Sequence, residues 1–203
     1  APGRRGRQAA PRALQVARVI GMPSNDEVIA ATRQWVERAV IGLNLCPFAR
    51  AVWVKNQVRI VVSTARHVDG LLDDLDRELD LLVNTPADEI DTTLLVHASL
   101  FPDFEVFNDF LGVVDEVVDE HELEGVIQVA PFHPDFRFEG TEPDDITNAT
   151  NRSPYPTLHL LREDSVARAV ASEGGDADAI VERNLRTLRE LGAQGWRDLL
   201  EKP

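Results

Sequence analysis

The chain has 203 residues, 43% hydrophobic and 28% charged, which suits one soluble domain with a short extension. Its formal net charge is -14, and residues 1–21 carry five arginines and no acid, so the rest of the chain is more acidic still. A body this acidic repels nucleic acid and anionic membrane surfaces, and we predict neither as a partner.

Residues 1–21 lack the apolar run of a secretory signal, and no window is apolar over the roughly 18 residues that a membrane span requires. The single cysteine, Cys46, excludes an internal disulfide and fits a reducing compartment. We therefore expect a cytoplasmic protein with a dispensable basic extension, residues 1–21, followed by one globular domain, residues 22–203.

The first predicted element is a helix that begins at a capping box. In this box, Ser24 and Glu27 would each accept a hydrogen bond from the other's backbone N–H group. Apolar residues at helical spacing continue to Leu43, and Cys46-Pro47 should end the helix because the residue before proline avoids the α region.

Two strands and a second helix are predicted next. Residues 51–54 and 58–63 are rich in strand-forming side chains, and a turn around Lys55-Asn56 would join them as a hairpin. Leucines at helical spacing in residues 68–82 form the apolar stripe of the following helix.

The rest of the chain alternates between strand and helix patterns. Residues 92–98 and 126–130 predict strands on either side of a helix at 102–121, and residues 158–161 predict a last strand before the C-terminal helices. This order predicts an α/β fold: a small, mostly parallel sheet flanked by helices, with a long irregular loop rich in Pro and Asn. A ferredoxin-like α+β sheet is the alternative.

The irregular loop occupies residues 131–156, where no helical or strand period is found. Loops of this length in compact domains are usually functional or disordered. Disorder is disfavoured because Phe132, Phe136, Phe138 and Tyr155 give the segment apolar surface to bury. We therefore interpret it as an ordered loop that builds a site.

Three side chains are the candidate catalytic residues: Cys46, His133 and His159. Together they would supply one thiolate and two imidazoles with an open fourth position, an arrangement known for catalytic zinc. We therefore also predict them as ligands of a divalent metal such as zinc. Two other interpretations of Cys46 stay open: a buried small hydrophobe, or a nucleophile, although a thiolate is disfavoured at the C-terminus of the first helix.

Further along, the chain carries groups suited to a small anionic substrate. The planar guanidinium groups of Arg152 and Arg162 match carboxylate and phosphate. The candidate substrate-binding residues are Asn148, Asn151, Arg152, Tyr155, Arg162 and Glu163. The structural alternative is a loop in which Asn and Pro residues only form turns and Arg162 pairs with Glu163.

Four segments carry a family resemblance: VIGLNLCPFA at 40–49, FPDFEVFNDFL at 101–111, IQVAPFHPDFRF at 127–138 and NRSPYPTLHLLRE at 151–163. In this order they resemble the bacterial domain of unknown function family 1415, over roughly residues 28–200. The resemblance implies a bacterial-type soluble protein and begins after the basic extension. It implies no reaction, cofactor or catalytic residue.

The function expected from these patterns is that of a small cytoplasmic enzyme with a polar pocket for a small anionic substrate, assisted by a metal. Two alternatives stay open, and the sequence does not decide whether the chain is an enzyme. One is a non-catalytic binding or scaffold domain. The other is a thiol enzyme in which Cys46 attacks and His133 or His159 is the base.

Overall fold

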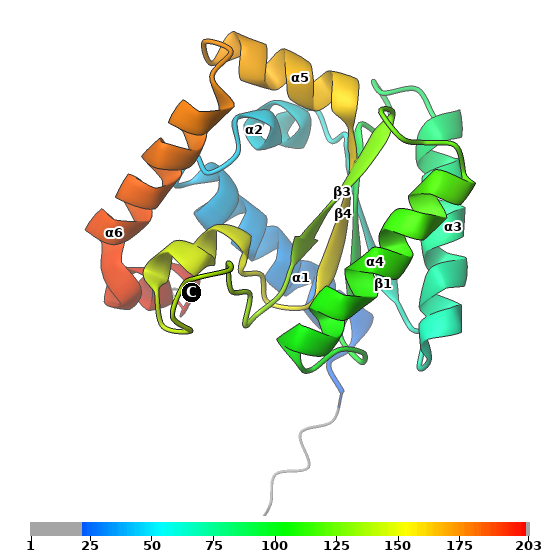
Figure 1. Cartoon of the computed structure of the whole chain (residues 1–203), viewed down its shortest axis with the longest axis horizontal. Coiled ribbons are helices and arrows are strands. Elements are labelled where there is room, and N and C mark those ends of the chain that lie inside the picture. Colours follow the sequence, from blue (N-terminus) through cyan, green and yellow to red (C-terminus); the bar gives the residue numbers. More distant parts are fainter. Residues whose placement is uncertain (1–21, 202–203) are drawn as a thin grey trace, which may run out of the picture.

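The computed structural model describes residues 22–201, and the predicted basic extension, residues 1–21, lies outside them. Helices cover both faces of a four-stranded sheet (Figure 1). The strands are β1 (Val58–Ser63), β2 (Thr92–His97), β3 (Ile127–Phe132) and β4 (Thr157–Arg162). Their order across the sheet is β1-β2-β4-β3.

The sheet is mixed, so the expectation of a mostly parallel sheet was wrong. β1 and β2 are parallel, whereas β4 is antiparallel to both of its neighbours, β2 and β3. The segment after β3 re-enters the sheet beside the end it left, with Phe132 paired to Thr157, so β4 has to run back. The element order also differs from the βαββαβ order of a ferredoxin-like fold.

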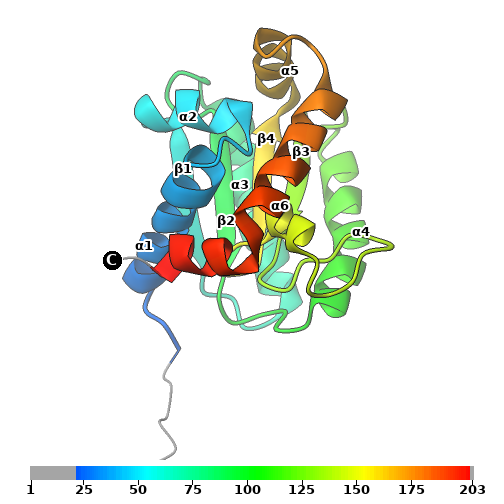
Figure 2. The same ribbon diagram turned by 90° about the vertical axis from the view of Figure 1, so that its left-hand side faces the viewer.

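The helical elements divide between the two faces. They are α1 (Asn25–Trp35), the π-helix η1 (Val36–Ile41), α2 (Pro47–Val54), α3 (Val68–Asn84), α4 (Phe104–Glu120), the 3-10 helix η2 (Ile146–Asn151), α5 (Glu163–Ser172) and α6 (Ala177–Glu201). Figures 1 and 2 show α3 and α4 on one side, the α3/α4 face, and α1, α2, α5 and α6 on the other, the α1/α6 face. In the part of the chain that is described, no helix is long and apolar enough to cross a membrane.

The predicted capping box is present at the start of α1. The Ser24 hydroxyl accepts a hydrogen bond from the backbone N–H of Glu27, and the Glu27 carboxylate accepts one of 2.8 Å from the backbone N–H of Ser24. α1 ends at Trp35, earlier than expected. The chain continues as η1 to Ile41, and a turn then precedes Cys46.

The predicted hairpin around Lys55-Asn56 was wrong, since α2 occupies the first of its two strands. Pro47 is the first residue of α2, where its missing N–H has no cost, and Phe48 and Val52 are buried one turn apart. The strand-forming residues of this segment therefore lie on a helix that packs by its apolar side.

The core of the α3/α4 face follows the predicted helical stripes. Its fully buried members include Leu71, Leu75, Leu79 and Leu82 of α3, Phe107 and Val114 of α4, and Leu95, Leu158 and Leu160 of the sheet. Successive strand residues point to opposite faces, so the neighbours of these sheet residues lie on the α1/α6 face.

Candidate functional site

A cavity of about 350 Å³ lies on the α1/α6 face, between the sheet and the helices that cover it. Side chains of all four strands, α1, η1, α2, η2, α5 and α6 line it, and most are aliphatic or aromatic. No Asp, Glu, Lys or Arg is among the described residues of the lining. Its polar members are Cys46, Thr92, Gln128, Thr150, Asn151 and His159.

Helical spacing explains the apolar wall that α5 contributes. Val166, Ala169 and Val170 lie three and four residues apart, so they share one side of α5, and all three line the cavity. On α6, Ile180 and Val181 line the cavity one turn before Asn184.

His159 is the ionisable imidazole in this lining. Its Nε2 lies 2.8 Å from Oγ1 of Thr92, and the same hydroxyl donates a hydrogen bond of 2.7 Å to the carbonyl oxygen of Leu160. Because Thr92 has one hydroxyl proton, its oxygen accepts from His159, and Nε2 must carry the imidazole proton. Burial lowers the pKa of His159 to about 4, so the ring is neutral at pH 7 and Nδ1 holds a lone pair.

Cys46 lines the same cavity, but its helical context differs from the expected one. It is the N-cap of α2, not the end of the first helix. Burial raises the pKa of its thiol, and the backbone N–H groups of Ala49 and Phe48 oppose this with a smaller effect. The thiol is therefore protonated at neutral pH.

His133 does not join this cavity. It lies on the α3/α4 side, where its ring stacks on Phe107 with the centroids 5.4 Å apart. Its Nε2 lies 3.0 Å from the carbonyl oxygen of Phe101, and its Nδ1 accepts a 3.0 Å hydrogen bond from the backbone N–H of Asp135. His133 follows Phe132, which lines the cavity, and the alternation of side chains along an extended chain separates the two.

The predicted metal site therefore does not form, because its three members are divided between the two faces of the sheet. Cys46 and His159 line the cavity, whereas His133 packs against α4. Within residues 22–201, no group of three or more His, Cys, Asp and Glu side chains could hold a metal ion.

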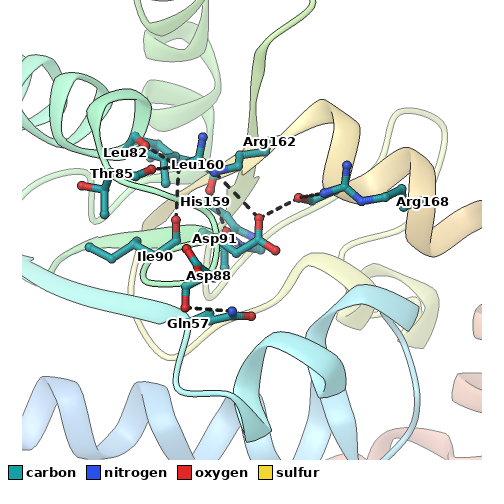
Figure 3. Close-up of polar contacts among 12 residues, drawn as sticks. Gln57, Leu82, Thr85, Asp88, Ile90, Asp91, His159, Leu160, Arg162 and Arg168 are labelled. Atoms are coloured by element: carbon teal, nitrogen blue, oxygen red, sulfur yellow. Dashed lines mark hydrogen bonds and ion pairs between the residues drawn. The ribbon is translucent and has the colours of Figure 1, made fainter.

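Arg162 is engaged by the backbone and not by a ligand pocket. Figure 3 shows its guanidinium group among the carbonyl groups of Leu82, Thr85 and Ile90, to which it donates hydrogen bonds. Its Nε also lies 3.8 Å from a carboxylate oxygen of Asp91. Arg162 is the last residue of β4, and its hydrogen bonds link the C-terminal end of α3 to the residues just before β2.

The other predicted substrate residues are mostly structural as well. Arg152 donates hydrogen bonds to the carbonyl oxygens of Phe136 and Pro143 at 3.2 and 2.6 Å. The side chain of Asn148 is fully buried and accepts hydrogen bonds from Phe138 and Thr141. The structural interpretation of this loop therefore applies to Asn148, and Arg152 also bonds within the loop.

Three predicted substrate residues remain. Asn151 lines the cavity, whereas Tyr155 and Glu163 are half-buried outside its lining. Sequence reasoning missed Thr92, which fixes the tautomer of His159. The signal available was strand alternation, which places Thr92 on the same face as Leu94 and Val96.

Comparison with known protein families assigns residues 27–198 to one family. The model of the family described as "Protein of unknown function (DUF1415)" matches residues 27–198. The chain belongs to this family. No curated protein and no solved structure matches it. The match spans every strand and all the polar residues of the cavity lining, so the cavity is built within the family's domain.

Proposed function

We propose that the protein binds a small, uncharged and mostly apolar molecule in the cavity on the α1/α6 face. The observation that carries this proposal is the lining: aliphatic and aromatic side chains, a few polar groups and no charged residue among those described. Small-molecule sites are commonly of this kind, with volumes of roughly 300–1,000 Å³, and this cavity falls within that range.

The lining argues against the anionic substrate expected from the sequence. A charge transferred from water to an apolar site needs a partner, and none of the described lining residues is charged. Arg152 and Arg162 lie outside this lining, and both donate to backbone carbonyl groups. Small-molecule binding by a non-catalytic domain is therefore the better supported alternative. The composition and the single cysteine support a cytoplasmic location without nucleic-acid or membrane partners, which we propose with it.

A test of binding can use naphthalene as an apolar probe and Trp35, which lines the cavity, as a fluorescent reporter. Naphthalene should bind the wild-type protein and change its tryptophan emission. Ala169→Phe fills the cavity from α5 and should weaken binding at least tenfold. The matched control is Ala167→Phe, at an exposed position of the same helix, and it should leave the affinity within about twofold. Equal binding by both variants would refute the proposal.

A second function, thiol chemistry by Cys46 with His159 as base, is favoured by the presence of both in one cavity lining. Against it stands the raised pKa of the thiol, since the thiolate is the nucleophile. The rate of Cys46 alkylation by iodoacetamide between pH 6 and pH 10 tests it, because Cys46 is the only thiol. A rate that is already at its plateau at pH 7 would favour the thiol enzyme.

A further inference from the structure

We propose that the cavity selects a ligand that carries a neutral hydrogen-bond donor, such as a hydroxyl group, and that Nδ1 of His159 is its acceptor. This inference rests on the proposed function and names the class of ligand. It comes from the directions of the hydrogen bonds already made by the polar side chains of the lining.

The pair of His159 and Thr92 presents an acceptor to the cavity. The Thr92 proton is committed to the carbonyl oxygen of Leu160, and the Nε2 proton of His159 is committed to Thr92. Among the described residues, Nδ1 has no hydrogen-bond partner, although the ring lines the cavity. A ligand that donates a hydrogen bond would satisfy this unused lone pair.

Two further polar side chains of the lining also offer hydrogen-bond acceptors. Asn151 donates one amide N–H to the carbonyl oxygen of Pro131 at 3.1 Å, and its Oδ1 remains an acceptor. The hydroxyl of Thr150 donates to the carbonyl oxygen of Thr147 at 2.8 Å, so its oxygen can only accept further bonds.

The remaining polar groups of the lining do not outweigh these hydrogen-bond acceptors. Gln128 is exposed on the edge strand β3, where its amide is open to solvent. The thiol of Cys46 is a weak donor. A cationic donor such as an ammonium group is disfavoured because the described lining contains no carboxylate to balance its charge. A neutral O–H or N–H group on an apolar body fits best.

Three probes of closely similar shape separate the proposal from simple apolar binding. They are 2-naphthol, which has a donor; 2-methoxynaphthalene, which keeps the oxygen but has no donor; and naphthalene, which has neither. We expect calorimetric titration of the full chain at pH 7 to give 2-naphthol an affinity about two- to tenfold higher than either of the others, the range of one net hydrogen bond.

His159→Leu removes the acceptor and should abolish this preference while naphthalene still binds. The matched control, Leu161→Met, alters a neighbouring side chain of the same lining without adding or removing an acceptor, and should keep the preference. Equal affinity of all three probes for the wild-type protein, or a preference that survives in His159→Leu, would overturn the inference. Binding of none of them would instead refute the proposed function itself.

Two measurements keep the test decisive if His159→Leu does not fold. Long-range ¹H–¹⁵N NMR of the wild-type protein should show Nε2 protonated and Nδ1 unprotonated, with the Nδ1 signal shifting when 2-naphthol is added. Thr92→Val removes the group that fixes the tautomer, so the preference for 2-naphthol should fall and 2-methoxynaphthalene should gain affinity. A protonated Nδ1, or an unchanged preference in Thr92→Val, would contradict the assignment.

Discussion

The side chain of Asn184 donates a hydrogen bond of 2.6 Å to the carbonyl oxygen of Leu45, a residue 139 positions away in the chain. Asn184 is buried on α6, and Leu45 directly precedes Cys46 at the start of α2. The bond therefore joins two walls of the cavity. We infer that it holds α6 in place over the α1/α6 face.

Asn184→Ala should lower both stability and probe affinity. It leaves a buried carbonyl group without this donor, which typically costs about 1–3 kcal/mol. Urea unfolding measures the loss of stability, and titration with naphthalene measures the loss of affinity. Gln194→Ala, which removes two exposed side-chain hydrogen bonds from the same helix, is the control and should change stability by no more than about 0.5 kcal/mol. Unchanged affinity in Asn184→Ala would show that this bond does not shape the cavity.

His133→Ala should destabilise the fold without altering the cavity. The substitution removes a buried ring that stacks on Phe107 and leaves the partners of both ring nitrogens unpaired, at a cost of about 2–4 kcal/mol. Naphthalene affinity should stay within about twofold of wild type in the folded variant. His67→Ala, at an exposed histidine, is the stability control. A large loss of probe affinity with little loss of stability would return His133 to the ligand site.

The sequence predicts the parts of the fold whose pattern lies within one segment, and not those that depend on pairing between distant segments. The stripes of α3 and α4 were predicted correctly because their leucines and valines repeat at helical spacing over 17 residues each. The short α2 was predicted as a strand because its Val-Trp-Val composition outweighed the helix-starting signal of Pro47. The direction of β4 depends on where the chain re-enters the sheet, which no local pattern records.

The same distinction applies to the site. Cys46 and His159 were both predicted as site residues, and the structure places them in one cavity lining. Their separation from His133 follows from strand alternation, since Phe132 and His133 are adjacent and point to opposite sides. The structural role of Arg162 was not predictable, because its backbone partners lie 72 to 80 residues away.

Arg162→Met should be strongly destabilising, by about 2–4 kcal/mol, because three backbone carbonyl groups lose a charged donor. Urea unfolding measures this loss, and Arg186→Met, at an exposed position of α6, should stay within about 0.5 kcal/mol of wild type. If Arg162 instead served an anionic ligand, its removal would leave the stability of the free protein nearly intact. A loss as small as that of the control would therefore contradict the structural role.

The protein should lose stability as pH falls from about 6.5 towards 4, partly through two histidines. Burial lowers the pKa of His159 from 6.5 to about 4, and it does the same for His97, with a smaller contribution in that direction from nearby His133. In this window the unfolded chain binds protons at both residues while the folded chain does not, so protonation favours unfolding. Each histidine then lowers the free energy of unfolding by at most about 1.4 kcal/mol per pH unit.

His159→Leu isolates one of these contributions. Urea unfolding at pH 7, 6 and 5 should show a shallower loss of stability in this variant than in wild type, by up to about 1.4 kcal/mol per pH unit. Leu161→Met carries no titratable group and should keep the wild-type slope, which separates the effect of the imidazole from that of altered packing in the cavity. Carboxylates with lowered pKa values, such as Glu27, contribute equally to all three proteins and cancel in the comparison. Identical slopes for wild type and His159→Leu would mean that His159 titrates alike in the folded and unfolded chains, and would contradict the lowering of its pKa by burial.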